Sequence, residues 1–302
     1  MTISILPLLL GLVCAPLLNG VINRVKAYYA GRKGRPLLQL YFDLFKLLRK
    51  GEVISRTTTW VFEAGPSIYL STVICALLFV PFGTLHPPLG FAGDFILMAY
   101  LMAFGRFALV LAALDTGSAF EGMGASREAS FSALAEPVIF LCFLALGSGT
   151  PPSLYAFCRN AGMQIWTFAL PELLLIPAVL FVLLLVENCR IPVDDPNTHL
   201  ELTMIHEVII LDHSGPNLAF ILYASSLKLW LFALLLVNVL VPALPDDMPL
   251  ELALVLAGVF GTAALVGVVE SCMARLRMLV VPRMLSMAGM LAALALILTL
   301  NR

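Results

Sequence analysis

The chain has 302 residues, of which 61% are hydrophobic and only 12% are charged, and its mean hydropathy is +0.98. In soluble domains about a quarter of the residues are charged, so this composition excludes an ordinary soluble protein and predicts a polytopic membrane protein. The formal net charge of −1 gives no indication of a nucleic-acid partner. No polar segment reaches the roughly 50 residues of a small soluble domain. We therefore expect a single all-α membrane domain over residues 1–302.

Eight apolar segments are long enough to cross a bilayer, whose core needs about 20 apolar residues per helix. The predicted spans are 3–22, 64–84, 91–114, 130–148, 165–187, 218–242, 249–269 and 280–300. The first segment has no basic residues before its apolar run and no clear cleavage pattern of small residues. We interpret it as a retained span and not as a signal peptide.

Basic residues are distributed unevenly between the two ends of these spans. The loop at 23–56 holds nine of the 18 lysines and arginines. Five further arginines fall on the same side, at positions 127, 190, 275, 277 and 283, whereas only those at 159 and 302 fall on the other side. Because basic loops stay in the cytoplasm, this loop is predicted to be cytoplasmic and both termini periplasmic, in the cell inner membrane.

The first cytoplasmic loop contains the segment "RPLLQLYFDLFKLLRKGEV", in which polar residues recur every three to four positions. Pro36 suits a helix start and Gly51 a helix end, so we expect an amphipathic helix on the cytoplasmic side. One interpretation is a membrane-surface anchor. The other is a docking surface or cavity wall, for which Asp43 and Lys46 are the candidate residues.

The second cytoplasmic loop is predicted over 114–131, "LDTGSAFEGMGASREASF", because its glycines and serines break helix between two spans. Arg127 and Glu128 are its candidate functional charges.

The third loop, 186–215, gathers six of the 19 carboxylates of the chain, namely Glu187, Asp194, Asp195, Glu201, Glu207 and Asp212. The part "NTHLELTMIHEVII" has helical character after Asp195-Pro196, which suits a helix start. On such a helix Glu201 lies on the apolar face, where desolvation favours proton exchange. The alternative is a structural capping box formed by Thr198 and Glu201.

The histidines of this loop do not predict a metal site. His199, His206 and His213 are seven positions apart, so neighbours are separated by about 10 Å along a helix. Two ligands of one zinc ion must each lie about 2 Å from it. The six cysteines are scattered without a C-x-x-C pair, so we expect no cluster or metal in this chain.

Several ionisable residues lie within or at the ends of predicted spans, where an unpaired charge is costly. They are Arg106, Glu136, Glu172, Lys228, and, at the cytoplasmic helix ends, Glu187 and Glu270. Two interpretations stay open: ion pairs that hold the bundle together, or a proton path. The residues alone therefore predict a proton- or ion-handling membrane protein, with reaction and partners undetermined.

Four motifs in chain order resemble the complex I superfamily subunit that joins the membrane arm to the peripheral arm, above all its versions in formate hydrogenlyase, hydrogenase-4 and other group 4 membrane-bound [NiFe]-hydrogenases. The motifs are "GRKGRPLLQLYFDLFKLLRKGEV", "LDTGSAFEGMGASREASFSALAEP", "VENCRIPVDD…LEL…HSG" and "ESCMARLRMLVVPR". Residues that match charged positions of the family are Asp43, Lys46, Arg127, Glu128, Glu136, Glu187, Arg190, Asp194, Glu201 and Glu270.

The resemblance implies an eight-helix, non-catalytic subunit that couples electron transfer to the translocation of H⁺ or Na⁺. Its implied partners are hydrogenase-like large and small subunits, an iron–sulfur subunit and antiporter-like membrane subunits. The [NiFe] centre and the iron–sulfur clusters would lie in those partners.

An alternative within the same superfamily is a subunit that lines a quinone chamber. In quinone-using relatives the first-loop helix and neighbouring spans enclose the quinone, so a quinone is a possible ligand. This chain departs from their third loop, because Asn197 and His199 stand where two glutamates are expected. His199, titrating near neutrality, could replace one of them in the proton path. A stand-alone transporter with Arg106, Glu172 and Lys228 at its centre would require paired broken helices in matching halves, which the sequence does not show.

Overall fold

The structure, a computed structural model, describes residues 2–147, 151–166, 174–194, 204–242 and 247–301. Within these ranges it consists of helices, turns and one isolated bridge between Phe82 and Leu85, with no strand. The predicted all-α membrane class is therefore confirmed. Glu172, His199 and Glu201, three of the predicted proton-path residues, lie outside the described residues.

Among the described residues, seven helices are long and apolar enough to cross a membrane. They are α1 (Thr2–Tyr29), α3 (Trp60–Leu77), α4 (Asp94–Asp115), α5 (Ala119–Leu146), α9 (Gly215–Leu240), α10 (Met248–Cys272) and α11 (Val281–Leu300). The shorter apolar helix α7 (Leu175–Glu187) occupies the second half of the predicted span 165–187. Three further helices are α2 (Gln39–Leu48), α6 (Leu154–Trp166) and α8 (His206–Ile209).

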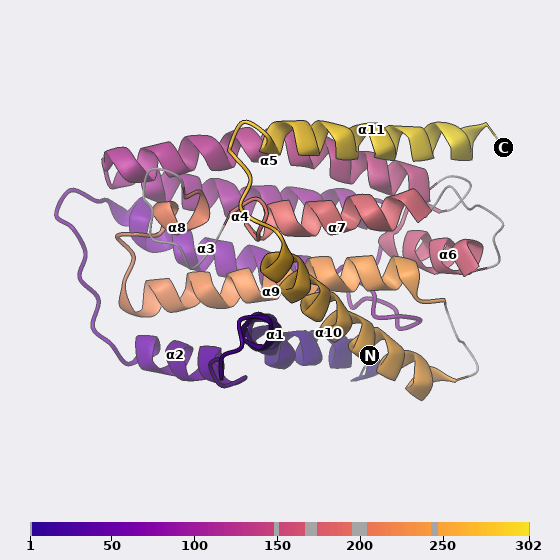
Figure 1. The fold of residues 1–302 in the computed structure, drawn as a ribbon, viewed down its shortest axis with the longest axis horizontal. Coiled ribbons are helices and arrows are strands. Elements are labelled where there is room, and N and C mark those ends of the chain that lie inside the picture. Colours follow the sequence, from indigo (N-terminus) through magenta and orange to yellow (C-terminus); the bar gives the residue numbers. More distant parts are fainter. Residues whose placement is uncertain (1, 148–150, 167–173, 195–203, 243–246, 302) are drawn as a thin grey trace.

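The long helices run side by side along the long axis of the molecule, and α10 crosses the others at an angle (Figure 1). We call the end at which α2 and α8 lie, on the left of Figure 1, the basic end, because the basic residues of and around α2 also lie there. Helix α6 and both chain ends lie toward the other side of the picture. Helix α9 is central: it contacts α1, α2, α3, α6, α7 and α10 and is buried along most of its length.

Helix α5 begins at Ala119, so most of the predicted second loop is helical and only 116–118 connects it to α4. The expectation that its glycines break the helix is confirmed at Gly117, which lies in this connection with φ of +71°, but was wrong for Gly122 and Gly124, and tertiary packing at Gly124 explains why. A Cβ at Gly124 would lie 3.1 Å from the carbonyl oxygen of Ile205 and from side-chain carbons of Val208 and Ile209. Gly124 thus lets the turn at α8 approach α5 closely, and this packing offsets the low helix propensity of glycine.

The described part of the third loop is only partly helical. Of the predicted helical segment 197–210, residues 195–203 are outside the described part, and the remainder is helical only over His206–Ile209. The predicted apolar face is nevertheless buried, since Met204, Ile205 and Val208 are each at most 1% exposed. These side chains anchor the loop to the bundle.

Helix α2 is present as predicted at the basic end, where it packs against α1 and α9. Its Leu44 is buried, whereas Phe42, Phe45 and Leu48 are exposed. Helix α6, in contrast, corresponds to no predicted element and packs Phe157, Cys158 and Ala161 into the core beside α9.

Candidate functional site

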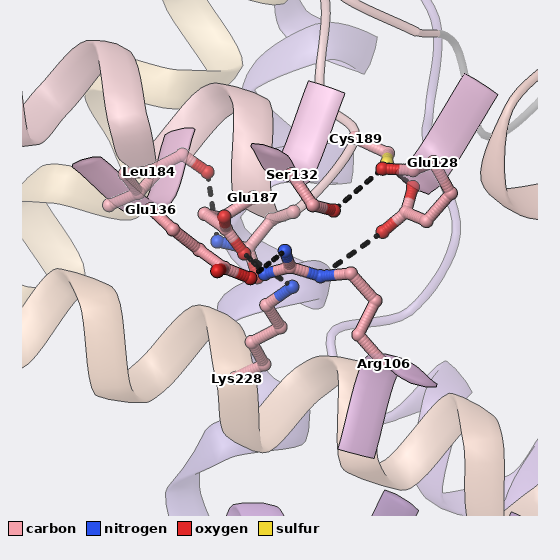
Figure 2. A network of polar contacts seen from close by, with 9 residues as sticks. Arg106, Glu128, Ser132, Glu136, Leu184, Glu187, Cys189 and Lys228 are labelled. Carbon is pink, nitrogen blue, oxygen red and sulfur yellow. Dashed lines mark hydrogen bonds and ion pairs between the residues drawn. The ribbon is translucent and has the colours of Figure 1, made fainter. Parts of the chain in front are cut away.

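The centre of the bundle holds an arginine surrounded by three carboxylates (Figure 2). Arg106 on α4 lies with Nη2 2.5 Å from Glu187 Oε2 and Nη1 3.3 Å from Glu136 Oε1. Its Nε is 3.6 Å from Glu128 Oε1. Lys228 on α9 completes this group, with Nζ 2.8 Å from the same Glu187 oxygen. We call these five residues the central charge cluster.

Three members of the central charge cluster are kept away from water, so their charges are stabilised mainly by one another. The side chains of Arg106, Glu187 and Lys228 are at most 8% exposed. Isolated charges in such surroundings are costly, and pairing with good geometry is what makes them tolerable. Three carboxylates face two cations, which leaves one carboxylate in excess. The cluster therefore carries a formal net charge of −1.

Glu136 differs from the other members because its side chain is 40% exposed on the flank of the bundle. A cavity of about 30 Å³ lies beside it, and Arg106, Glu187 and the aromatic residues Tyr100 and Phe140 line this cavity. A carboxylate at this depth would meet lipid in an isolated chain, which is unfavourable. This flank is thus the side on which the cluster is least enclosed.

A second polar region opens at the basic end. A cavity of about 280 Å³, the basic-end cavity, lies between α1, α2, α8, α9 and segment 188–194. Its polar lining includes Asn19, Gln39, Asp43, Arg190, Asp194 and His206. Gln39 Nε2 donates to Asp43 Oδ1 at 2.9 Å within α2. The structure therefore makes α2 a cavity wall, one of the two interpretations left open by the sequence.

Ion pairs fix the walls of the basic-end cavity. Glu270 at the end of α10 pairs with Lys26 at 2.8 Å and with Arg190 at 3.5 Å. Arg190 also donates to Asn19 Oδ1 on α1. Asp194 pairs with Arg275 at 2.8 Å and accepts from the backbone N–H of Ile205 at 2.7 Å. Segment 188–194 is thereby tied to α1, α10 and the segment that leads to α11.

The predicted docking residues divide into inward and outward groups. Arg127 donates to the carbonyl oxygen of Met204 at 2.8 Å, and Arg190 points into the cavity wall. Both therefore hold loops in place. Lys46 is exposed on α2, where a partner could reach it.

Sequence reasoning missed three residues of these sites, namely Asn19, Lys26 and Arg275, and it weighed His206 only as a metal ligand. Asn19, Asn23 and Lys26 on α1 recur at helical spacing, and this polar stripe was a usable signal. Lys26 and Arg275 were counted only as basic loop residues, and their partners are far away in the chain. Among the described residues, no group of three His, Cys, Asp or Glu side chains is placed to hold a metal ion.

Comparison with known proteins agrees with this architecture. The model of the NADH dehydrogenase family matches residues 1–301. Hydrogenase-4 component C of Escherichia coli (strain K12) is 29% identical over 94% of this chain and 91% of its own length. Formate hydrogenlyase subunit 4 of the same strain is 28% identical over 89% of each chain.

The same fold occurs in a solved structure, that of the membrane-bound sulfane sulfur reductase, an archaeal respiratory membrane complex. The TM-score is 0.83 at 20% identity, over 99% of this chain and 98% of the other. The resemblance to the complex I superfamily, and to its hydrogenase-4 and formate hydrogenlyase versions, is confirmed. With a family model matched along almost its whole length, this multi-pass membrane chain belongs to the NADH dehydrogenase family.

Proposed function

We propose that the chain is the membrane subunit of a hydrogenase-type energy-converting complex and passes protons from the basic-end cavity to the flank at Glu136. The observation that carries this proposal is the excess carboxylate in the central charge cluster. A cluster with equal numbers of positive and negative charges would serve only to hold the helices together. One unmatched carboxylate gives the cluster a proton-accepting state inside the membrane.

The proposed orientation places the basic end in the cytoplasm and both termini in the periplasm, with the chain in the cell inner membrane. The concentration of lysine and arginine at that end supports this orientation. The peripheral module would then dock over the basic-end cavity, where exposed Lys46 is available for contact.

The names of the relatives support partners of hydrogenase type, because one is a hydrogenase-4 component and another a formate hydrogenlyase subunit. We assign the [NiFe] centre and the iron–sulfur clusters to hydrogenase-like large and small subunits and an iron–sulfur subunit docked at the basic end. Antiporter-like membrane subunits would cover the flank at Glu136, and the translocated ion would be H⁺ or Na⁺.

Glu136→Gln in the assembled complex tests the proposal sharply. The substitution removes the excess charge and leaves Glu128 and Glu187 opposite Arg106 and Lys228, so the bundle stays paired. We expect normal assembly but loss of redox-driven proton uptake by inverted membrane vesicles. Glu63→Gln, at an exposed glutamate on α3, is the matched control and should leave uptake unchanged. Full proton translocation in Glu136→Gln would refute the proposal.

A second candidate function is the binding of a quinone in the basic-end cavity, since α2 and segment 188–194 enclose it. The amide and charged lining suits water better than an apolar ring and tail, so this function ranks second. Quinone added to the purified complex, with donor-driven reduction followed spectroscopically, separates the two. Reduction that Gln39→Leu abolishes would favour the quinone.

A further inference from the structure

The basic-end cavity and the central charge cluster are close to each other but not joined. A small space of about 10 Å³ lies beside the cluster, lined by Glu128, Ser132 and Glu187 among others. That volume is about the minimum that holds one water molecule. Cys189 lines both this space and the basic-end cavity, so this residue forms part of the wall between them.

Cys189 is held firmly in this wall. It is 7% exposed, and its Sγ donates a weak hydrogen bond to Glu128 Oε2 at 3.8 Å (Figure 2). Its backbone has φ of +47°, in the left-handed region that glycine and asparagine adopt more readily than cysteine. The next residue, Arg190, is tied to Glu270 and Asn19. Movement of segment 188–194 would therefore move this thiol.

The chemistry of the thiol suits a barrier better than a proton carrier. Sulfur is a weak hydrogen-bond donor and acceptor, so it orders water poorly. Burial, reinforced by the negative charge of Glu128, raises the pKa of the Cys189 thiol well above its ordinary value, so it stays neutral at physiological pH. A neutral, weakly polar group between two polar spaces interrupts a chain of hydrogen bonds.

We propose that the Cys189 side chain is the seal between the basic-end cavity and Glu128, which prevents protons from passing until segment 188–194 moves. This inference rests on the proposed proton path and adds a barrier that interrupts the path at Cys189. In the resting complex, Cys189 would block protons. Partner docking or a redox change could shift segment 188–194, and this shift would open the route to the cluster.

Cys189→Gly tests the seal, because glycine removes the side chain and accepts the left-handed backbone without strain. In vesicles that contain the assembled complex, we expect passive proton conductance to rise by about tenfold, the effect of lowering a barrier by about 1.4 kcal/mol. The number of protons translocated per redox turnover should fall, while turnover itself persists. Cys189→Ser retains most of the side-chain volume but supplies a hydroxyl that orders water, so its conductance should lie between those of the parent protein and Cys189→Gly.

The double variant Cys189→Gly/Glu136→Gln distinguishes a leak through the path from general damage. If the leak runs through the cluster, the second substitution suppresses it, whereas a damaged bundle leaks in both. Cys189→Gly vesicles as tight as the parent, with an unchanged proton yield, would overturn the seal. If the Cys189→Gly vesicles are as tight as the parent but the Glu136→Gln complex loses proton translocation, the seal is wrong and the proposed function still holds.

Discussion

Arg106 faces two carboxylates from α5 and one from the end of α7, so a single side chain joins three helices. Its guanidinium group is planar and has donors on several sides, which lets it serve all three carboxylates at once. The sequence identified Arg106, Glu136, Glu187 and Lys228 as charges within or at the ends of spans. It could not show that they meet, because their separations along the chain carry no information on how helices pack.

Arg106→Gln should destabilise the folded bundle strongly. It leaves three carboxylates opposite Lys228 alone, and breaking a buried ion pair costs about 3–5 kcal/mol. We expect a marked fall in the thermal unfolding midpoint in detergent, with partial recovery in Arg106→Lys. Arg159→Gln, at an exposed arginine near Tyr155, is the control. Equal midpoints for Arg106→Gln and the control would contradict this account of the cluster.

His213 makes the stability of the folded chain depend on pH in the acidic range. Its ring stacks on Phe62 with centroids 4.0 Å apart, and neither ring nitrogen has a hydrogen-bond partner in the described part of the chain. Burial lowers its pKa from 6.5 to about 4. Between these two pH values the unfolded chain binds one proton more than the folded chain. Stability is therefore fully present above pH 6.5 and falls as the pH drops toward 4.

The expected loss is about 1.4 kcal/mol per pH unit, or about 3 kcal/mol over the whole window. Thermal midpoints at pH 7 and pH 4.5 measure it, and His213→Phe should remove much of the difference while retaining the stack. His86→Phe is the control, because His86 also stacks at 4.0 Å, on Tyr155, but is exposed. Identical acid sensitivity in the two variants would show that His213 is not responsible.

At the scale of elements, the apolar segments predicted the long helices well, because a bilayer requires about 20 apolar residues per span. The start of α5 was predicted less well. Gly122 and Gly124 suggest a helix break when only local propensity is considered. In the folded chain, Gly124 is the contact point for α8, and that contact is invisible in the local sequence.

Two neighbouring glycines allow this contact to be measured. Gly124→Ala should destabilise the chain by about 1–3 kcal/mol, because a methyl group 3.1 Å from the Ile205 carbonyl oxygen forces α8 away. Gly122→Ala meets nothing within 4 Å and should stabilise α5 by up to about 1 kcal/mol. Opposite signs in thermal unfolding are the expected result. Equal effects would mean that α8 does not pack as described.

At the scale of the whole molecule, the asymmetry of basic residues predicts the orientation. A reporter that is active only outside the cytoplasm, fused after Arg302, should be active, and one fused in the loop at 51–56 should not. Adding four lysines to the connection at 84–90, at the opposite end, should lower the activity of the C-terminal fusion. An inactive C-terminal fusion on the parent chain would reverse the proposed orientation and place the basic-end cavity outside.

The central position of α9 has a consequence for biosynthesis. Helices α1, α3 and α7, which it contacts, leave the ribosome earlier, while α10 follows it. The early helices therefore cannot close around their final neighbour until about residue 240 has been made, and Glu187 waits in the membrane without Lys228. During this interval Arg106 is the cation of the cluster that can pair with Glu187, so we expect Arg106 to stabilise the nascent chain as well as the finished protein.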